Sequence, residues 1–199
     1  MGDGELIDIA RKKSKASFDF GIIAVLLSGL FWAFSRAHQD AYGVCDGTYW
    51  LLIHLEWLYF LGLIISFRAV HLGVSRIRTQ GGKARHFYNL LALAGIFLGC
   101  AVLLAPVGSM VQKNLHDMQG FYQIVLDFLR SSIVLWVLPL MVYVGVLGAV
   151  KNARALKTGG SDKNLILLVM FVVMALAGLK IAHFLWTAAH GFDCWHAGW

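Results

Sequence analysis

The sequence is poor in charged residues and in proline, and both shortages narrow the class of protein. Only 14% of its 199 residues are charged and two are proline, whereas 59% are hydrophobic. A soluble domain carries about 25% charged and about 45–50% apolar residues. The composition therefore predicts an all-α membrane protein that forms a single membrane domain over residues 1–199.

Signatures of catalysis are also missing from the sequence. No GxSxG, HExxH or Walker motif occurs. Little sequence lies outside the apolar runs, which leaves almost no room for an independent catalytic domain. We therefore expect that the chain is not catalytic alone, although it would fit as a subunit of an oxidoreductase.

Five apolar runs predict five transmembrane helices. They cover residues 20–35, 49–70, 87–111, 121–150 and 165–190. A membrane span needs about 20 residues, so the first run is short, and the fourth is long enough to tilt. Residues 1–18 form a basic, amphipathic N-terminal segment, and residues 191–199 form an outer tail.

The positions of lysine and arginine predict the orientation. The net charge is +6, but the basic residues gather in short segments between the apolar runs, so no nucleic-acid partner is expected. The opposite loops hold only Arg36 and Lys113. Since loops rich in Lys and Arg stay in the cytoplasm, the N-terminus is predicted to be cytoplasmic and the C-terminus extracytoplasmic, in a membrane such as the bacterial inner membrane.

The two connections on the basic side resemble each other. Gly81-Gly82 and Gly159-Gly160 each lie between basic residues and an apolar run, and aligning them gives an offset of 78 residues. Helices two–three and four–five could therefore be repeated hairpins. The alternative is that Gly and basic residues are simply common in cytoplasmic turns.

Six polar residues interrupt three of the apolar runs at a similar predicted depth. They are His54 and Glu56 in the second run, Asp127 and Arg130 in the fourth, and Lys180 and His183 in the fifth. A rise of 1.5 Å per residue puts them about 8–15 Å below the outer boundary. Such a layer either fixes helix packing through hydrogen bonds or lines a site for a cofactor, quinone, ion or proton path.

Haem b is the cofactor that the histidines suggest. His54 and His183 match in depth within one helical turn, as two axial ligands would require. Glu56, Asp127, Arg130 and Lys180 would then tune its charge or relay protons. Small five-helix haem-b anchors of respiratory complexes are similar in length and helix count. They usually place ligating histidines on four helices, whereas the first, third and fourth runs here contain none, so no family is assigned.

A second candidate site lies at the outer surface. The residues are His38, His116, His190, Cys194 and His196. Imidazole and thiolate groups suit copper or zinc, but no spacing matches a standard zinc module. These histidines could equally be polar residues at the membrane interface.

Cysteine is scarce, with three residues and no CxxC motif, which argues against a thiol oxidoreductase. Cys100 lies within the third run. Cys45 and Cys194 are both predicted outside, where an oxidising compartment would allow a disulfide between them. Two free or metal-bound thiols are the alternative.

Together these features predict an integral membrane subunit of a larger complex. Its specific role would be haem-b- and quinone-linked electron transfer toward an extracytoplasmic partner. The alternatives are a non-catalytic scaffold or assembly subunit and a metal-ion or proton translocating component. Other membrane subunits, the lipid bilayer and quinone are the expected partners.

Overall fold

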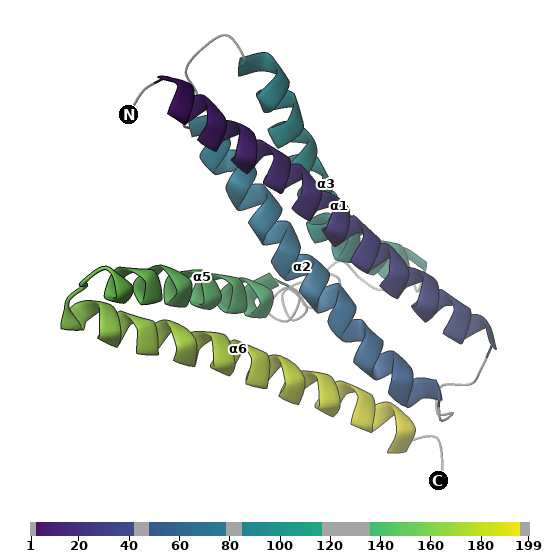
Figure 1. Ribbon diagram of the computed structural model, residues 1–199. Coiled ribbons are helices and arrows are strands. Elements are labelled where there is room, and N and C mark those ends of the chain that lie inside the picture. Colours follow the sequence, from purple (N-terminus) through teal and green to yellow (C-terminus); the bar gives the residue numbers. More distant parts are fainter. Residues whose placement is uncertain (1–2, 42–47, 79–84, 117–135, 196–199) are drawn as a thin grey trace. The chain divides into compact units, whose positions relative to one another are not determined.

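The computed structural model describes residues 3–41, 48–78, 85–116 and 136–195, and within these ranges all regular structure is helical (Figure 1). The helices are α1 (Asp3–Ala41), α2 (Thr48–Arg78), α3 (Arg85–His116), α5 (Leu138–Lys157) and α6 (Asp162–Trp195). The predicted all-α class is thus confirmed. The orientation of the termini and the hairpin repeat stay predictions.

Four of these helices contain stretches that are long and apolar enough to cross a membrane. The stretches are Gly4–Phe31, Trp57–Ile77, Arg85–Leu104 and Asp162–Leu185. They lie in four of the five predicted helical regions. The remaining predicted run, 121–150, is described only from residue 136, and its described part forms much of α5.

Helices α1, α2, α3 and α6 are longer than the apolar runs that predict them. Helix α1 has 39 residues and begins at Asp3, so residues 3–18 of the basic segment and the first run form one helix. The predicted connection after residue 150 is helical through Lys157, and α6 continues through Trp195 into the predicted outer tail. Apolar runs mark only residues that suit lipid, whereas backbone hydrogen bonds can continue the helix beyond it.

The chain divides into two compact units, Met1–Gln119 and Gly120–Trp199. In unit 1, helices α1, α2 and α3 all contact one another. Their seams are made of small residues. A methyl group added at Gly95 of α3 would lie 2.7 Å from the carbonyl carbon and oxygen of Ser17 in α1. One added at Gly99 would lie 3.1 Å from the carbonyl oxygen of Ser66 in α2.

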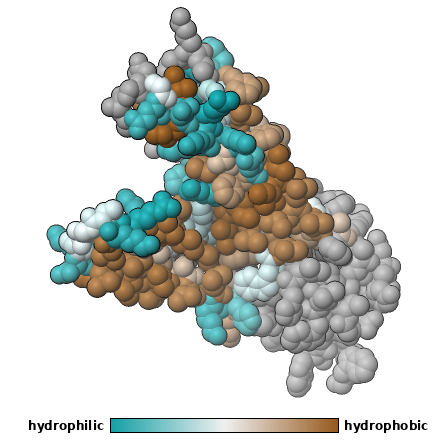
Figure 2. Space-filling model, viewed as in Figure 1, coloured by the Kyte–Doolittle hydropathy of each residue, from teal (hydrophilic) through white to brown (hydrophobic). Residues whose placement is uncertain are grey.

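Hydrogen bonds from α1 fix the register of unit 1. Ser17 Oγ donates to the carbonyl oxygen of Ala69 in α2 over 2.8 Å, and Ser14 Oγ donates to that of Tyr88 in α3 over 2.8 Å. Both serines are completely buried. These bonds place the basic start of α1 beside the end of α2 and the start of α3. Figure 2 shows hydrophilic residues gathered at this N-terminal end and hydrophobic residues along the adjoining middle part of the bundle.

Large aliphatic side chains cover the outside of the described helices. Leu26, Leu90 and Phe97 of unit 1 are 60%, 67% and 72% exposed, while buried positions include Ala24, Ala69 and Ala92 at 0%. This distribution, with small residues inside and large apolar residues outside, is expected where lipid replaces water around the helices. It supports the membrane assignment independently of helix length.

Unit 2 is an antiparallel hairpin of α5 and α6. The α6 seam contains Phe171, Ala175, Gly178 and Ala182, spaced by four, three and four residues. A methyl group at Gly145 of α5 would lie 2.8 Å from the carbonyl oxygen of Phe171. The two backbones therefore approach as closely as those of unit 1.

A glycine-dependent turn joins the hairpin. Gly160 N–H donates to the carbonyl oxygen of Ala155 over 2.9 Å, and Gly159 N–H donates to that of Leu156 over 3.2 Å. Gly159 has a φ of +87°, in the left-handed region. This is the Schellman pattern of helix termination, which needs a residue without a Cβ penalty at that position.

We predict that Gly95→Ala destabilises unit 1. The added methyl group would meet the backbone of Ser17, and overpacking of this kind costs about 1–3 kcal/mol. Thermal unfolding of the purified chain in detergent measures the loss. Gly29→Ala on α1 is the matched control, because nothing lies within 4 Å of its added methyl group. If the two substitutions lower the unfolding temperature equally, the close packing of Gly95 on Ser17 does not contribute to stability as described.

We also predict that Gly159→Ala destabilises the hairpin by about 1 kcal/mol, because an L side chain strains the left-handed conformation. Gly159→Asn should lose less, since asparagine enters this region more readily than alanine. Thermal unfolding of the two variants under the same conditions tests the order. An alanine variant as stable as the original chain would show that the turn does not depend on this conformation.

Candidate functional site

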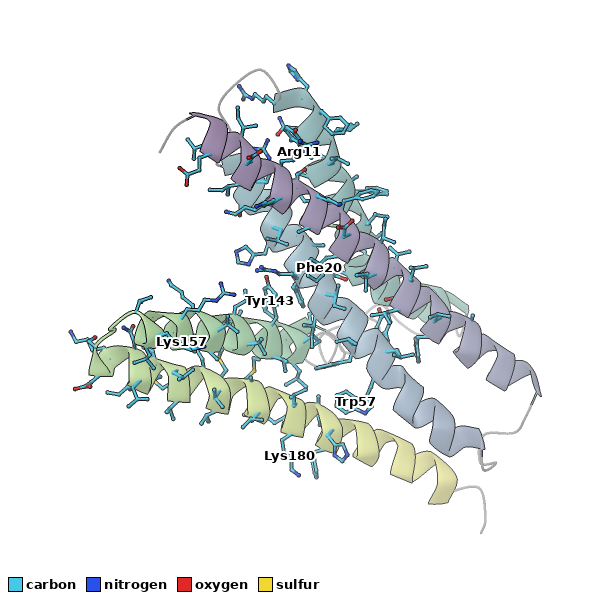
Figure 3. The ribbon with its side chains drawn as sticks, viewed as in Figure 1. Arg11, Phe20, Trp57, Tyr143, Lys157 and Lys180 are labelled. Atoms are coloured by element: carbon cyan, nitrogen blue, oxygen red, sulfur yellow. The ribbon has the colours of Figure 1, made fainter. Side chains whose placement is uncertain are left out.

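Lys180 and His183 lie on the face of α6 that does not pack on α5. Gly178 packs against Val142 of α5 and Ala182, one turn further along α6, is also buried, whereas Lys180 and His183, which lie three residues apart, are exposed. Figure 3 shows Lys180 pointing away from α5. The hairpin seam thus decides which way these two polar side chains point.

Their surroundings on α6 are apolar. Leu176 and Phe184 are 60% and 68% exposed, and Leu179 and Ile181 are 38% and 43% exposed. A charged side chain at the bilayer centre costs from about 2.5 to more than 10 kcal/mol, although a lysine near the boundary reduces the cost by reaching toward the headgroups. The Lys180 cation on this face therefore calls for a polar neighbour or for a position near the boundary.

The cations of the hairpin turn locate that boundary. Arg154, Lys157 and Lys163 are all exposed around the turn, and such residues belong in the headgroup region. Lys180 follows Lys163 by 17 residues, a rise of about 26 Å. The hydrocarbon core is about 30 Å thick. The pair therefore lies toward the opposite boundary of the core, and α6 continues beyond it through Trp195.

The other members of the predicted polar layer lie outside the described side chains. His54 and Glu56 belong to the first turns of α2 by their backbone, but their side chains are not among those described. Asp127 and Arg130 fall within 117–135, outside the described residues. The structure therefore locates two of the six predicted residues, and the layer as a whole stays a prediction.

The predicted outer metal site and disulfide likewise fall outside the described side chains. His38, His116, His190 and Cys194 belong to helices α1, α3 and α6 by their backbone only, and Cys45 and His196 lie outside the described residues. Among the described side chains, no three His, Cys, Asp or Glu residues come close enough to hold a metal ion. Cys100, which is described, is a free thiol.

The structure also brings together polar residues that sequence analysis did not connect. Lys13 Nζ donates to Ser75 Oγ over 3.3 Å, which joins α1 to α2. Arg68 and His71 lie on the same helix as Ser75. The signal was present in α2, where Arg68, His71 and Ser75 recur at spacings of three and four residues and so share one face. The contribution of Lys13 depends on the packing of α1.

Arg76 is a further residue that the sequence did not single out. Its side chain is 3% exposed, and its Cζ lies 5.4 Å from the centre of the Tyr88 ring. A guanidinium over an aromatic face is a favourable cation–π contact, stronger when water is excluded. This contact joins the end of α2 to the start of α3.

Comparisons with known proteins give no relative for this arrangement: no family model matches the chain, and neither the curated proteins nor the solved structures contain a match.

Proposed function

We propose that the protein is an integral membrane subunit of a larger complex and that the far part of α6 forms its contact with other subunits. The observation that carries the proposal is the exposure of Lys180 on an otherwise apolar face. Polar groups that face the interior of an assembly find partners there, which removes the cost of facing lipid.

The length of α6 supports the same proposal. The helix has 34 residues, or about 51 Å, which exceeds the hydrocarbon core by about 20 Å. Its cations at the turn hold the other end at the headgroups, so the excess lies beyond Lys180. A single helical extension gains little stability from its own hydrogen bonds in water. Packing against another protein surface would stabilise it.

Within this proposal, the specific role is haem-b- and quinone-linked electron transfer toward an extracytoplasmic partner. In this role His54 and His183 would hold the haem. Lys180, three residues from His183 on the same face of α6, would tune the charge of such a cofactor. Haem b would supply one-electron transfer when bound, while the chain would hold and orient it.

A cofactor-free scaffold is the second candidate, and the seams of unit 1 favour it. Methyl groups at Gly62, Gly73 and Gly99 would lie 3.4 Å or less from backbone oxygens of the facing helices. No planar cofactor fits between backbones at this separation. A haem in this protein would therefore bind outside these seams, and a chain without one would serve as a rigid packing element.

We predict that Lys180→Leu combined with His183→Leu disrupts the complex. The double variant removes the polar groups proposed to contact partners, so most of the chain should migrate at lower mass in native electrophoresis of membranes solubilised in mild detergent. Lys163→Leu, which removes an exposed cation at the turn of the same helix, is the control and should leave migration unchanged. If the chain without substitutions already migrates as a monomer, the proposal that it belongs to a larger complex is wrong.

If the protein binds haem b, its visible absorption spectrum should show it. Protein purified from its native membrane should show a Soret band that shifts and sharpens on reduction with dithionite, and His183→Ala should lose it. His86→Ala, at an exposed histidine near the start of α3, is the control and should retain the band. Absence of a Soret band in an intact complex would leave the scaffold as the function.

A further inference from the structure

We propose that Lys13, Arg68 and His71, together with Ser75, form a groove between α1 and α2 that binds the phosphate of an anionic phospholipid headgroup. This site is separate from the proposed contact surface on α6 and does not depend on the function proposed above. It depends only on the membrane location of unit 1.

The groove is positioned by the packing of α1 on α2. The bond from Ser17 Oγ to the Ala69 carbonyl and the bond from Lys13 Nζ to Ser75 Oγ run between the two antiparallel helices. Arg68, His71 and Ser75 share one face of α2, and Lys13 meets that face from α1. The opposite flank of α2 packs on α3, as the Arg76–Tyr88 contact shows.

The residues that form the groove are accessible. His71 is exposed, and Lys13, Arg68 and Ser75 are half-buried. Arg68, His71 and Ser75 share one face of α2, and Lys13 reaches this face through its bond to Ser75. Three nitrogen-bearing side chains and one hydroxyl therefore lie along one side of the contact between α1 and α2, where a phosphate could accept hydrogen bonds from them.

The charges around the groove are dominated by cations. Arg11, Lys12 and Lys15 lie within two residues of Lys13 on α1, and all three are exposed. The described acids of α1 lie elsewhere. Asp8 is five residues before Lys13 and Asp19 six residues after it, which is about 8–9 Å along the helix and on other sides of it. The local field thus favours an anion.

Helix length places the groove at the level of the headgroups. From Asp19 to the end of α1 at Ala41 there are 22 steps, or about 33 Å, enough to cross the hydrocarbon core of about 30 Å. From Arg68 back to the start of α2 at Thr48 there are 20 steps, or about 30 Å. The groove residues therefore lie toward the cation-bearing ends of the apolar stretches Gly4–Phe31 and Trp57–Ile77, near the boundary of the core.

An apolar surface continues from the groove toward the core. Leu61 precedes Arg68 by seven residues on the same face of α2 and is 45% exposed, and Phe20 of α1 is half-buried. An acyl chain could follow this surface while its phosphate stays in the groove. Free inorganic phosphate would use the cations but not this surface. The combination favours a phospholipid.

Lipid binding to the full-length chain in detergent tests the site. Native mass spectrometry during titration with phosphatidylglycerol or phosphatidylcholine measures the affinity for each lipid. We expect phosphatidylglycerol to bind more tightly, and Lys13→Gln with Arg68→Gln to weaken it by about fivefold per cation, since one basic residue near the surface contributes about 1 kcal/mol. Phosphatidylcholine binding should change little.

Arg11→Gln with Lys15→Gln is the matched control. It removes the same charge from exposed positions on α1 that point away from Lys13. If both double variants lose phosphatidylglycerol binding equally, the lipid is held by a general electrostatic attraction. That result would overturn the proposed site. Retention of the affinity in the control supports it.

Two further measurements separate the remaining outcomes. If millimolar inorganic phosphate displaces phosphatidylglycerol, the site binds the free ion, and the proposal of a phospholipid ligand is overturned. If the Lys13→Gln and Arg68→Gln pair unfolds in phosphatidylcholine, Arg68→Gln alone decides, because it leaves the Lys13–Ser75 bond in place. Unchanged phosphatidylglycerol affinity in that folded single variant would overturn the proposal.

Discussion

The close approach of helix backbones at glycine and serine is the constraint on which this structure depends. In lipid, apolar side chains gain nothing by leaving the solvent, so helices associate through van der Waals contact and hydrogen bonds. Both are short-ranged and need small residues at the seam. Gly95 against Ser17 in unit 1 and Gly145 against Phe171 in unit 2 provide this approach. The buried hydroxyl of Ser17, bonded to the Ala69 carbonyl, adds direction to the packing.

The close approach of the helix backbones also limits where polar side chains can be placed. A seam that excludes a methyl group has no space for a lysine or histidine, so these residues are placed at the edges or on the outer faces of the helices. Lys180 and His183 lie outside the seam of Gly178 and Ala182, and Arg68 and His71 lie beside the seam that contains Ala69. Recognition by a partner or a lipid is therefore expected on the outer surfaces of the helices, where the two proposed sites are found.

The sequence predicts the number and type of helices in the described chain because long apolar runs have few other solutions in a membrane. It does not predict where the helices end, since the segment from Lys151 to Lys157, which is too polar to belong to an apolar run, is still helical. Spacing alone places Lys180 and His183 on one side of α6, but their direction follows from which residues meet α5. The groove of Lys13 with Arg68 and His71 was missed for the same reason, because Lys13 is 55 residues before Arg68 and only the packing of α1 on α2 brings them to the same place.

The excess length of the helices explains why polar surfaces occur at the ends of the spans. In unit 1 the excess lies on the side of the cations, since α1 begins 16 residues before Asp19. In unit 2 it lies on the side away from the cations, because the turn after Lys157 is short and α6 runs on to Trp195. Cations at a boundary resist movement into the core, and apolar side chains resist movement out of it. In a bilayer each unit would thereby be held at a fixed depth, and the helical part outside the core would lie in the headgroup region or beyond it.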